Sequence, residues 1–217
     1  MSATELPTAR GAAIGRQISI GLYTALYKVR LHGTEHVPKE GPVLLAPNHT
    51  GFIDAPMLVG VSPRPVHALA KRELFRGPLG WLLHGVGQIP IDRNGPDRAA
   101  LMTAMKVLDN GRVLGIFPEG TRGVGDFSEL RSGLVWFAMR TGAPVVPLVF
   151  TGTAGRSSTL GGMPRLRSRI DVTFGAPIRV EASGRGRAAL DAATEQLRDG
   201  LLAHVAAVYE RQQERES

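Results

Sequence analysis

The sequence contains no cysteine. This absence excludes a disulfide framework, a thiol nucleophile and any metal or iron–sulfur site held by thiolates. Aromatic residues make up only 6% of the chain, and they are not interleaved with the basic residues. Their scarcity argues against a nucleic-acid surface on which bases stack, so we expect no nucleic-acid partner.

Features that would define several other classes of protein are missing as well. The longest uncharged stretches, 77–91 and 141–155, are interrupted by glycine and proline, whereas a spanning helix needs roughly 18 apolar residues. There is no Walker loop, no complete G-x-G-x-x-G and no G-x-S-x-G elbow, so a serine hydrolase has no obvious nucleophile. No cluster of histidine and carboxylate residues has a usual ligand spacing, and we therefore expect no metal site.

What the chain has in excess is positive charge, +7 over 217 residues. This excess is compatible with an ordinary arginine-rich surface, and equally with attraction to phosphates, an anionic membrane or an acidic partner. Composition leaves these alternatives open. The length suits one domain with a real core, and no linker or internal repeat divides it.

The first clear pattern is IGRQISIGLYTALYKVR, residues 14–30. Apolar residues recur there at steps of three and four, as in an amphipathic helix: Ile14, Ile18, Leu22, Ala25, Leu26 and Val29. The stripe can pack on the protein's own core or lie in a membrane interface. We therefore divide the chain into an N-terminal helical element, 1–31, which is a possible membrane contact, and a single domain, 32–217.

Apolar runs typical of strands alternate with helical patterns along this domain. We predict strands at 42–47, 66–70, 88–92, 112–117, 144–150 and 169–175, and helices at 97–109, 129–140 and from Leu190 to Val208. The alternation predicts an α/β fold with a mostly parallel sheet flanked by helices. In such sheets, ligands bind beyond the carboxyl ends of the strands.

Polar residues follow several of these predicted strands. They are His49, Lys71, Arg93, Glu119 and Arg122. Because the carboxyl ends of parallel strands share one edge of the sheet, we expect a single site there. The remaining histidines have no carboxylate partner apparent in the sequence and are expected on the surface or in packing positions: His32, His36, His67, His84 and His204.

The segment NHTGFID, residues 48–54, contains a candidate general base. On a continuous helix, His49 and Asp54 would lie about 140° apart, so they meet only if the backbone between them turns. Gly51 lies in that gap and tolerates the dihedral angles of a turn. A histidine oriented by a buried carboxylate is well suited to accept a proton near neutral pH. The nucleophile would then arrive with the substrate.

The segment FPEGTR, residues 117–122, combines groups that suit a phosphate-bearing ligand. Gly120 allows close approach of the backbone, Thr121 offers a hydroxyl, and Arg122 offers a planar fork of donors. Glu119 can accept a hydrogen bond from a substrate hydroxyl. The segment is equally compatible with a polar turn closed by a local salt bridge.

Two more basic residues are candidates for substrate binding. Arg93, in IPIDR, can be a second phosphate ligand or a surface arginine paired with Asp92 or Asp97. Lys71, in ALAKREL, can contact the substrate or stabilise an oxyanion, although surface lysines are common.

In this order, NHTGFID, GQIPIDR, FPEGTR and VPLVFTG resemble the four sequence blocks of the glycerolipid acyltransferase superfamily, and in particular its PlsC-like branch. The resemblance runs from about residue 32 to 180. It implies transfer of a fatty acyl group from a thioester, acyl-CoA or acyl carrier protein, to the hydroxyl of lysophosphatidate. The thioester is then a co-substrate, and no other cofactor is expected.

The resemblance also implies roles for individual residues. His49 is the base and Asp54 orients it, Arg93, Glu119, Gly120 and Arg122 bind the acceptor, and Pro147 helps to shape the donor side. Acceptor, acyl-CoA and membrane are all anionic, which agrees with the basic charge. We expect a peripheral protein on the cytoplasmic face of the cell membrane.

Two alternatives to lysophosphatidate acylation remain open. The same chemistry can act on glycerol 3-phosphate, another lysophospholipid or a glycolipid alcohol. A catalytically silent module that binds lipid phosphates would need Arg93 and Arg122, but not the pair of His49 and Asp54.

Overall fold

The computed structural model describes residues 6–93, 95–120, 127, 130, 132–154, 162–181 and 186–216. Within them, one sheet has the strand order β1-β7-β6-β2-β5-β3-β4. The strands are β1 (Lys28–His32), β2 (Val43–Pro47), β3 (Val66–Lys71), β4 (Ile89–Ile91), β5 (Val113–Gly115), β6 (Val145–Thr151) and β7 (Arg169–Phe174). Neighbours pair in parallel, except for the antiparallel pair of β6 and β7. The prediction of a mostly parallel sheet is confirmed.

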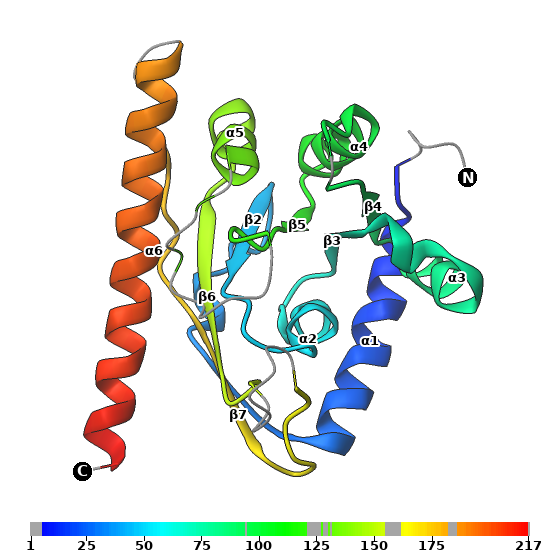
Figure 1. Ribbon diagram of the computed structural model, residues 1–217, viewed down its shortest axis with the longest axis vertical. Helices are drawn as coiled ribbons and strands as arrows, with labels where there is room; N and C mark the ends of the chain where they lie inside the picture. The colour runs from blue at the N-terminus through cyan, green and yellow to red at the C-terminus, as the bar shows by residue number, and fades with distance from the viewer. Residues whose placement is uncertain are drawn as a thin grey trace.

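Helices cover both faces of this sheet (Figure 1). They are α1 (Ala9–Leu26), α2 (Asp54–Val61), α3 (Gly77–Gly85), α4 (Arg98–Asp109), α5 (Ser132–Thr141) and α6 (Arg187–Glu216). Residues of α4, α5 and α6 share one buried cluster with the sheet, and residues of α1 and α2 share the other. The long helix α6 and the pair α1 and α3 lie on opposite sides of the molecule (Figure 1).

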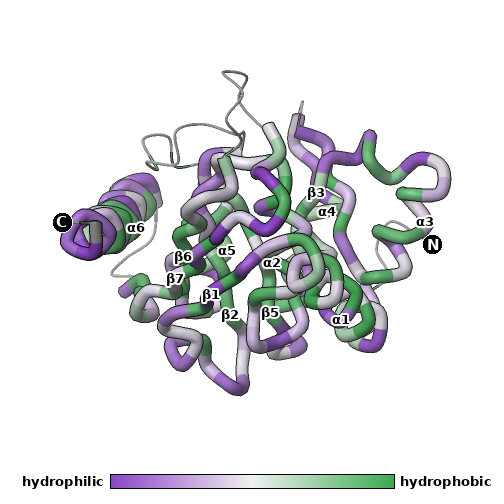
Figure 2. Tube along the Cα trace, turned by 90° about the horizontal axis from the view of Figure 1, so that it is seen from below, coloured by the Kyte–Doolittle hydropathy of each residue, from purple (hydrophilic) through white to green (hydrophobic). Residues whose placement is uncertain are grey.

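The central strand β2 shows why the sequence has uninterrupted apolar runs. Leu44 packs in the cluster under α4, α5 and α6, whereas its neighbour Leu45 packs in the cluster under α1 and α2. Both residues are fully buried. A strand that is covered on both faces needs an apolar side chain at every position. In Figure 2, α6 instead alternates between hydrophilic and hydrophobic residues, as expected for a helix with one face in water.

The N-terminal helix differs from its predicted range of 14–30. It begins at Ala9 and ends at Leu26, and Tyr27 is extended. Residues 28–32 form the edge strand β1, which pairs with β7 near the other end of the chain. These long-range hydrogen bonds override the helical periodicity of the local sequence.

The face that α1 buries also differs from the apolar stripe in its sequence. The buried positions are small residues, Gly11, Ala12, Gly15 and Ser19, which permit close approach of the helix. The large residues Ile14, Ile18 and Leu22 are 58%, 51% and 54% exposed. These three side chains therefore do not pack on the core of the protein.

Candidate active site

His49 and Asp54 are in contact between the end of β2 and the start of α2. Nδ1 of His49 lies 3.1 Å from Oδ2 of Asp54. The same oxygen accepts hydrogen bonds from the backbone N–H groups of Thr50 and Gly51, each at 2.7 Å. An ionised carboxylate only accepts hydrogen bonds, so a neutral His49 opposite an ionised Asp54 donates through Nδ1 and keeps a lone pair on Nε2. The predicted turn and contact are confirmed, and the nitrogen that remains is suited to accept a proton.

The fold fixes the position of Asp54. It is the first residue of α2 and is fully buried. The partial positive charge at a helix N-terminus favours a carboxylate there, and the two N–H groups compensate for the loss of water at its Oδ2 atom. The side chain of His49 remains 13% exposed. The pair thus combines a buried carboxylate with an imidazole that a substrate can reach.

The loop between the two residues is held against the end of β6. A Cβ on Gly51 would lie 2.4 Å from the carbonyl oxygen of Thr153, so a larger residue would displace the loop. The hydroxyl oxygens of Thr50 and Thr153 are 3.2 Å apart. On the other side, the ring of His49 packs against the ring of Phe117, with centroids 4.3 Å apart. These contacts restrict the orientation of the imidazole.

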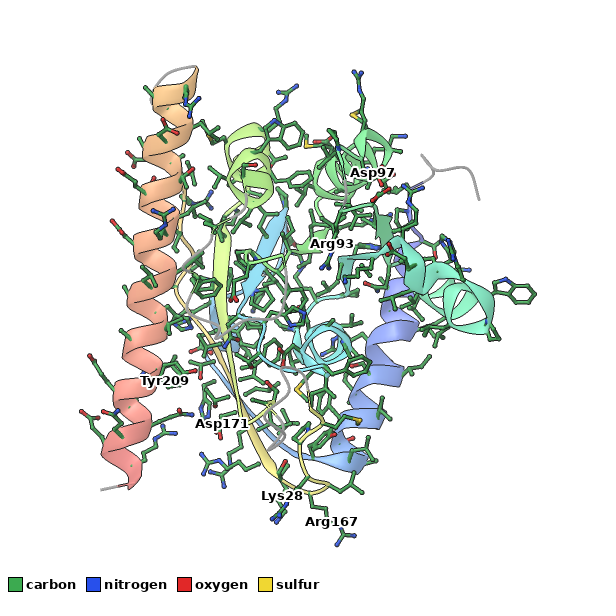
Figure 3. The ribbon with its side chains drawn as sticks, in the orientation of Figure 1. Lys28, Arg93, Asp97, Arg167, Asp171 and Tyr209 are labelled. Carbon is green, nitrogen blue, oxygen red and sulfur yellow. The ribbon has the colours of Figure 1, made fainter. Side chains whose placement is uncertain are left out.

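A second polar cluster joins the ends of β4 and β5. Nη1 of Arg93 donates a hydrogen bond to the carbonyl oxygen of Gly120 (Arg93 is labelled in Figure 3). Gly120 has a φ of 69°, which favours glycine, and its N–H bonds to the carbonyl of Phe117 at 3.1 Å. Since Phe117 also contacts His49, the turn 117–120 connects Arg93 with the imidazole.

The other predicted ligands lie in different surroundings. Glu119 belongs to the same turn and is only 7% exposed. Lys71 is the last residue of β3 and is exposed. Pro147 is buried in the middle of β6. Thr121 and Arg122 lie outside the described residues, so their roles stay predictions.

Comparison with known proteins identifies the family of this chain. A family model described as Acyltransferase matches residues 28–151, which include His49, Asp54, Arg93 and the turn 117–120. The chain belongs to the Acyltransferase family. A 1-acyl-sn-glycerol-3-phosphate acyltransferase of Bacillus subtilis is 35% identical over 126 residues, 57% of this chain and 63% of the relative. A protein of the same name from Streptococcus pneumoniae is 31% identical over 153 residues, 69% of this chain and 55% of the relative.

A solved structure supports the fold of this acyltransferase-family chain. The 1-acyl-sn-glycerophosphate acyltransferase PlsC of Thermotoga maritima superposes with a TM-score of 0.65 and 22% identity, over 92% of this chain and 78% of that chain. The match to the curated relatives covers a smaller part of them, 63%, 56% and 55% of the first three. Their activity is therefore a proposal for this chain.

Sequence reasoning missed Asn48 in this member of the Acyltransferase family. Its side chain is fully buried, donates to the carbonyl of Phe150 at 3.2 Å and accepts from the N–H of Phe150 at 2.8 Å. These bonds extend the pairing of β2 with β6 and so set the direction in which His49 leaves the strand. An asparagine directly after a buried strand, where a polar group needs partners, was the available signal.

His32 has a carboxylate partner that the sequence does not reveal. Its Nε2 lies 3.2 Å from Oδ1 of Asp171. The two residues lie on the neighbouring strands β1 and β7, far apart in the sequence. The pairing register of those strands, which the sequence does not give, brings them together.

Proposed function

We propose that this chain transfers a fatty acyl group from an acyl thioester to the hydroxyl of lysophosphatidate, giving phosphatidate, with His49 as the general base. The observation that carries the proposal is the bond of His49 to a buried Asp54 that two backbone N–H groups also hold. Membership of the Acyltransferase family supports the reaction class. The names of the relatives support the acceptor.

The chemistry follows from the orientation of the imidazole. Nε2 of His49 takes the proton of the acceptor hydroxyl while the hydroxyl oxygen bonds to the thioester carbonyl carbon. Asp54 stabilises the imidazolium that forms. When the C–S bond breaks, the imidazolium returns the proton to the sulfur, which leaves as a thiol. A positioned base typically contributes about 10²–10⁴-fold to the rate, and this route needs no acyl-enzyme.

The phosphate of the acceptor is proposed to bind on the side of β4 and β5. Arg93 and the turn that contains Glu119 and Gly120 lie there, next to the ring stack of Phe117 on His49. Thr121 and Arg122, which follow directly in sequence, are assigned to the same phosphate, with Lys71 at the neighbouring strand end. Planar guanidinium groups suit a phosphate because they can donate two parallel hydrogen bonds.

We further propose that the protein attaches peripherally to an anionic membrane, on its cytoplasmic face. The exposed stripe of Ile14, Ile18 and Leu22 on α1 has no place in the core. The α3 helix packs beside α1, since a Cβ on Gly11 would lie 2.2 Å from the carbonyl oxygen of Gly85. It adds three exposed apolar residues, Leu79, Trp81 and Leu82. Tryptophan is enriched at membrane–water interfaces.

The C-terminal end of α1 adds positive charge to this surface. The N–H of Arg167 donates to the carbonyl of Leu26 at 2.6 Å, and Lys28 lies two residues after the last residue of the helix (Lys28 and Arg167 are labelled in Figure 3). Leu166, beside Arg167, is 69% exposed. Basic residues next to exposed apolar ones favour an anionic lipid surface. No helix in the described part of the chain is long and apolar enough to cross a bilayer.

Product analysis tests the reaction directly. The purified protein is offered radiolabelled acyl-CoA, or acyl carrier protein carrying the same chain, with lysophosphatidate, glycerol 3-phosphate, other lysophospholipids and neutral alcohols. We expect phosphatidate from lysophosphatidate as the main labelled product. Transfer to a different acceptor would reassign the substrate. Tight binding of lipid phosphates without transfer to any acceptor would instead indicate a catalytically silent binding module.

A further inference from the structure

A cavity of about 640 Å³ opens beside the loop between His49 and Asp54, and the proposed acceptor site does not use it. It lies between the C-terminal half of α6 and the paired strands β6 and β7. Tyr209 of α6 and Asp171 of β7 line it from its two sides (both are labelled in Figure 3). Its volume is in the range of ordinary small-molecule sites, roughly 300–1,000 Å³.

The cavity reaches the loop that carries His49. Thr50, the residue after His49, is part of its lining. The N–H of Thr50 donates to the same Asp54 oxygen that His49 contacts. A ligand that fills the cavity therefore ends next to the base.

The lining carries positive charge, which suits an anionic ligand. Its described residues include three arginines, Arg169, Arg211 and Arg215, and one carboxylate, Asp171. That carboxylate is already occupied, because Arg169 binds it through two hydrogen bonds of 2.6 and 2.9 Å. Arg211 donates to the carbonyl of Ala207 through Nε, and this bond does not engage its two terminal amino groups. Arg211 and Arg215 thus bring positive charge that Asp171 does not balance.

The cavity also contains a group suited to a base ring. Tyr209 is 41% exposed and belongs to the lining. An aromatic face beside guanidinium groups is a typical combination for a nucleotide, whose base stacks while its phosphates accept hydrogen bonds.

The sheet order places this cavity opposite the acceptor side. Arg93 and Gly120 follow β4 and β5, on one side of β2, whereas the cavity borders β6 and β7 on the other. His49 follows β2 and so lies between them. Two anionic substrates can therefore approach the base from opposite flanks without competing for the same arginines.

We propose that this cavity binds the adenosine 3′,5′-bisphosphate portion of CoA, so that the pantetheine arm of the acyl donor passes Thr50 to reach His49. The proposal rests on the acyltransferase function above. Arg211 and Arg215 hold phosphate groups, and Tyr209 stacks on the adenine. A cavity that presents an aromatic ring beside arginines suits a nucleotide better than the surface of a carrier protein.

The test compares two donors that differ only in the nucleotide. Initial rates are measured with acyl-CoA and with the same acyl group on pantetheine, for wild type and for the double variant Arg211→Ala, Arg215→Ala. We expect the KM for acyl-CoA to rise at least about tenfold, which corresponds to the loss of one charge-assisted hydrogen bond, while the kinetics with acyl-pantetheine stay unchanged. Arg187→Ala, an exposed arginine near the start of the same helix, is the matched control and should change neither donor.

A binding measurement separates the failure of this site from the failure of the enzyme assignment. Calorimetry with adenosine 3′,5′-bisphosphate should detect binding to wild type and not to the double variant. Binding without acyl transfer would retain the nucleotide site and overturn the proposed function. An unchanged KM for acyl-CoA, equal impairment of both donors, or equal sensitivity of an acyl carrier protein donor would overturn the nucleotide site.

Discussion

Gly51 lies so close to Thr153 that a Cβ added to it would be 2.4 Å from the Thr153 carbonyl oxygen. The N–H of Gly51 also donates to Asp54, so any displacement of this residue disturbs the carboxylate that orients His49. We predict that Gly51→Ala lowers kcat at least about tenfold, because a shift of about 1 Å near the reacting groups can cost about 100-fold. Initial rates with saturating substrates measure the effect.

The matched control for this change is Gly133→Ala. Gly133 lies in α5, and a Cβ there would meet nothing within 4 Å. The control should keep the wild-type rate and gain up to about 1 kcal/mol of stability, since alanine favours a helix more than glycine does. A Gly51→Ala enzyme with unchanged kcat would show that the loop tolerates the displacement.

His49→Ala should remove turnover and leave the fold intact. In the proposed mechanism the imidazole accepts the proton, so its loss is expected to lower kcat by about 10²–10⁴-fold. Asp54→Asn should cause a smaller but still large loss, because the amide can hold the ring in the wrong tautomer. Rates and thermal unfolding are measured together. A folded His49→Ala variant with near-normal turnover would refute the general-base assignment.

The position of the candidate site could be predicted from the sequence because its residues follow strongly apolar runs. PVLLAP directly precedes Asn48 and His49, and IPI precedes Arg93 with only Asp92 between. A strand buried on both faces is recognisable without knowing its neighbours, and the edge of a parallel sheet then collects the residues after each strand.

The elements that were missed depend on contacts between distant residues. The apolar spacing of α1 indicates the correct type of element but leaves open which face is buried, and the structure buries the face of Gly11 and Gly15 rather than that of Ile14. Residues 28–32 form a strand only because β7 pairs with them. The short helix α2 is apolar nearly all round, so it has no periodic stripe to detect.

One buried histidine, His67, and one half-buried histidine, His204, should make stability depend on pH. Burial lowers the pKa of His67, although the carbonyl of Gly87 partly opposes the effect, and burial likewise lowers the pKa of His204. In the unfolded chain both residues titrate near the ordinary value of about 6.5. Below that pH the unfolded state binds more protons than the folded state, so the free energy of unfolding falls as the pH decreases. The fall ends once the pH is below the folded pKa values.

Urea denaturation between about pH 7.5 and 5.5 measures this dependence. The double variant His67→Gln, His204→Gln is expected to be less stable at pH 7.5 and to have a flatter profile. If its slope equals that of wild type, other groups cause the pH dependence.

The membrane proposal predicts that α1 and ionic strength both control binding to vesicles. The double variant Ile18→Gln, Leu22→Gln should weaken co-sedimentation with vesicles that contain anionic lipids at least about tenfold, since burying one large apolar side chain contributes about 1.5–3 kcal/mol. Added salt should weaken the binding of wild type, because each basic residue near the surface contributes about 1 kcal/mol that salt screens. The control is Leu202→Gln, an exposed apolar residue on α6. Equal binding of all three proteins would contradict the assignment to α1.

Arg93→Ala is expected to act on the acceptor rather than on the donor. The guanidinium donates to Gly120 and lies beside the turn that contacts His49 through Phe117. Its loss is therefore expected to remove the proposed phosphate ligand and to loosen the turn. The KM for lysophosphatidate should rise at least about tenfold, while the KM for acyl-CoA should change much less. Some loss of kcat should follow, because a misplaced hydroxyl reacts more slowly. Arg93→Lys should restore only part of the effect, since an ammonium keeps the charge and loses the paired geometry.

A neutral acceptor separates phosphate binding from a general disturbance of the site. Monoacylglycerol should be a poor substrate for wild type, and Arg93→Ala should hardly change its low rate. Arg98→Ala, an exposed arginine in the first turn of α4, removes the same charge nearby and should leave both acceptors unaffected. If wild type uses monoacylglycerol as well as it uses lysophosphatidate, Arg93 does not select a phosphate, and a neutral alcohol such as a glycolipid becomes the better assignment for the acceptor.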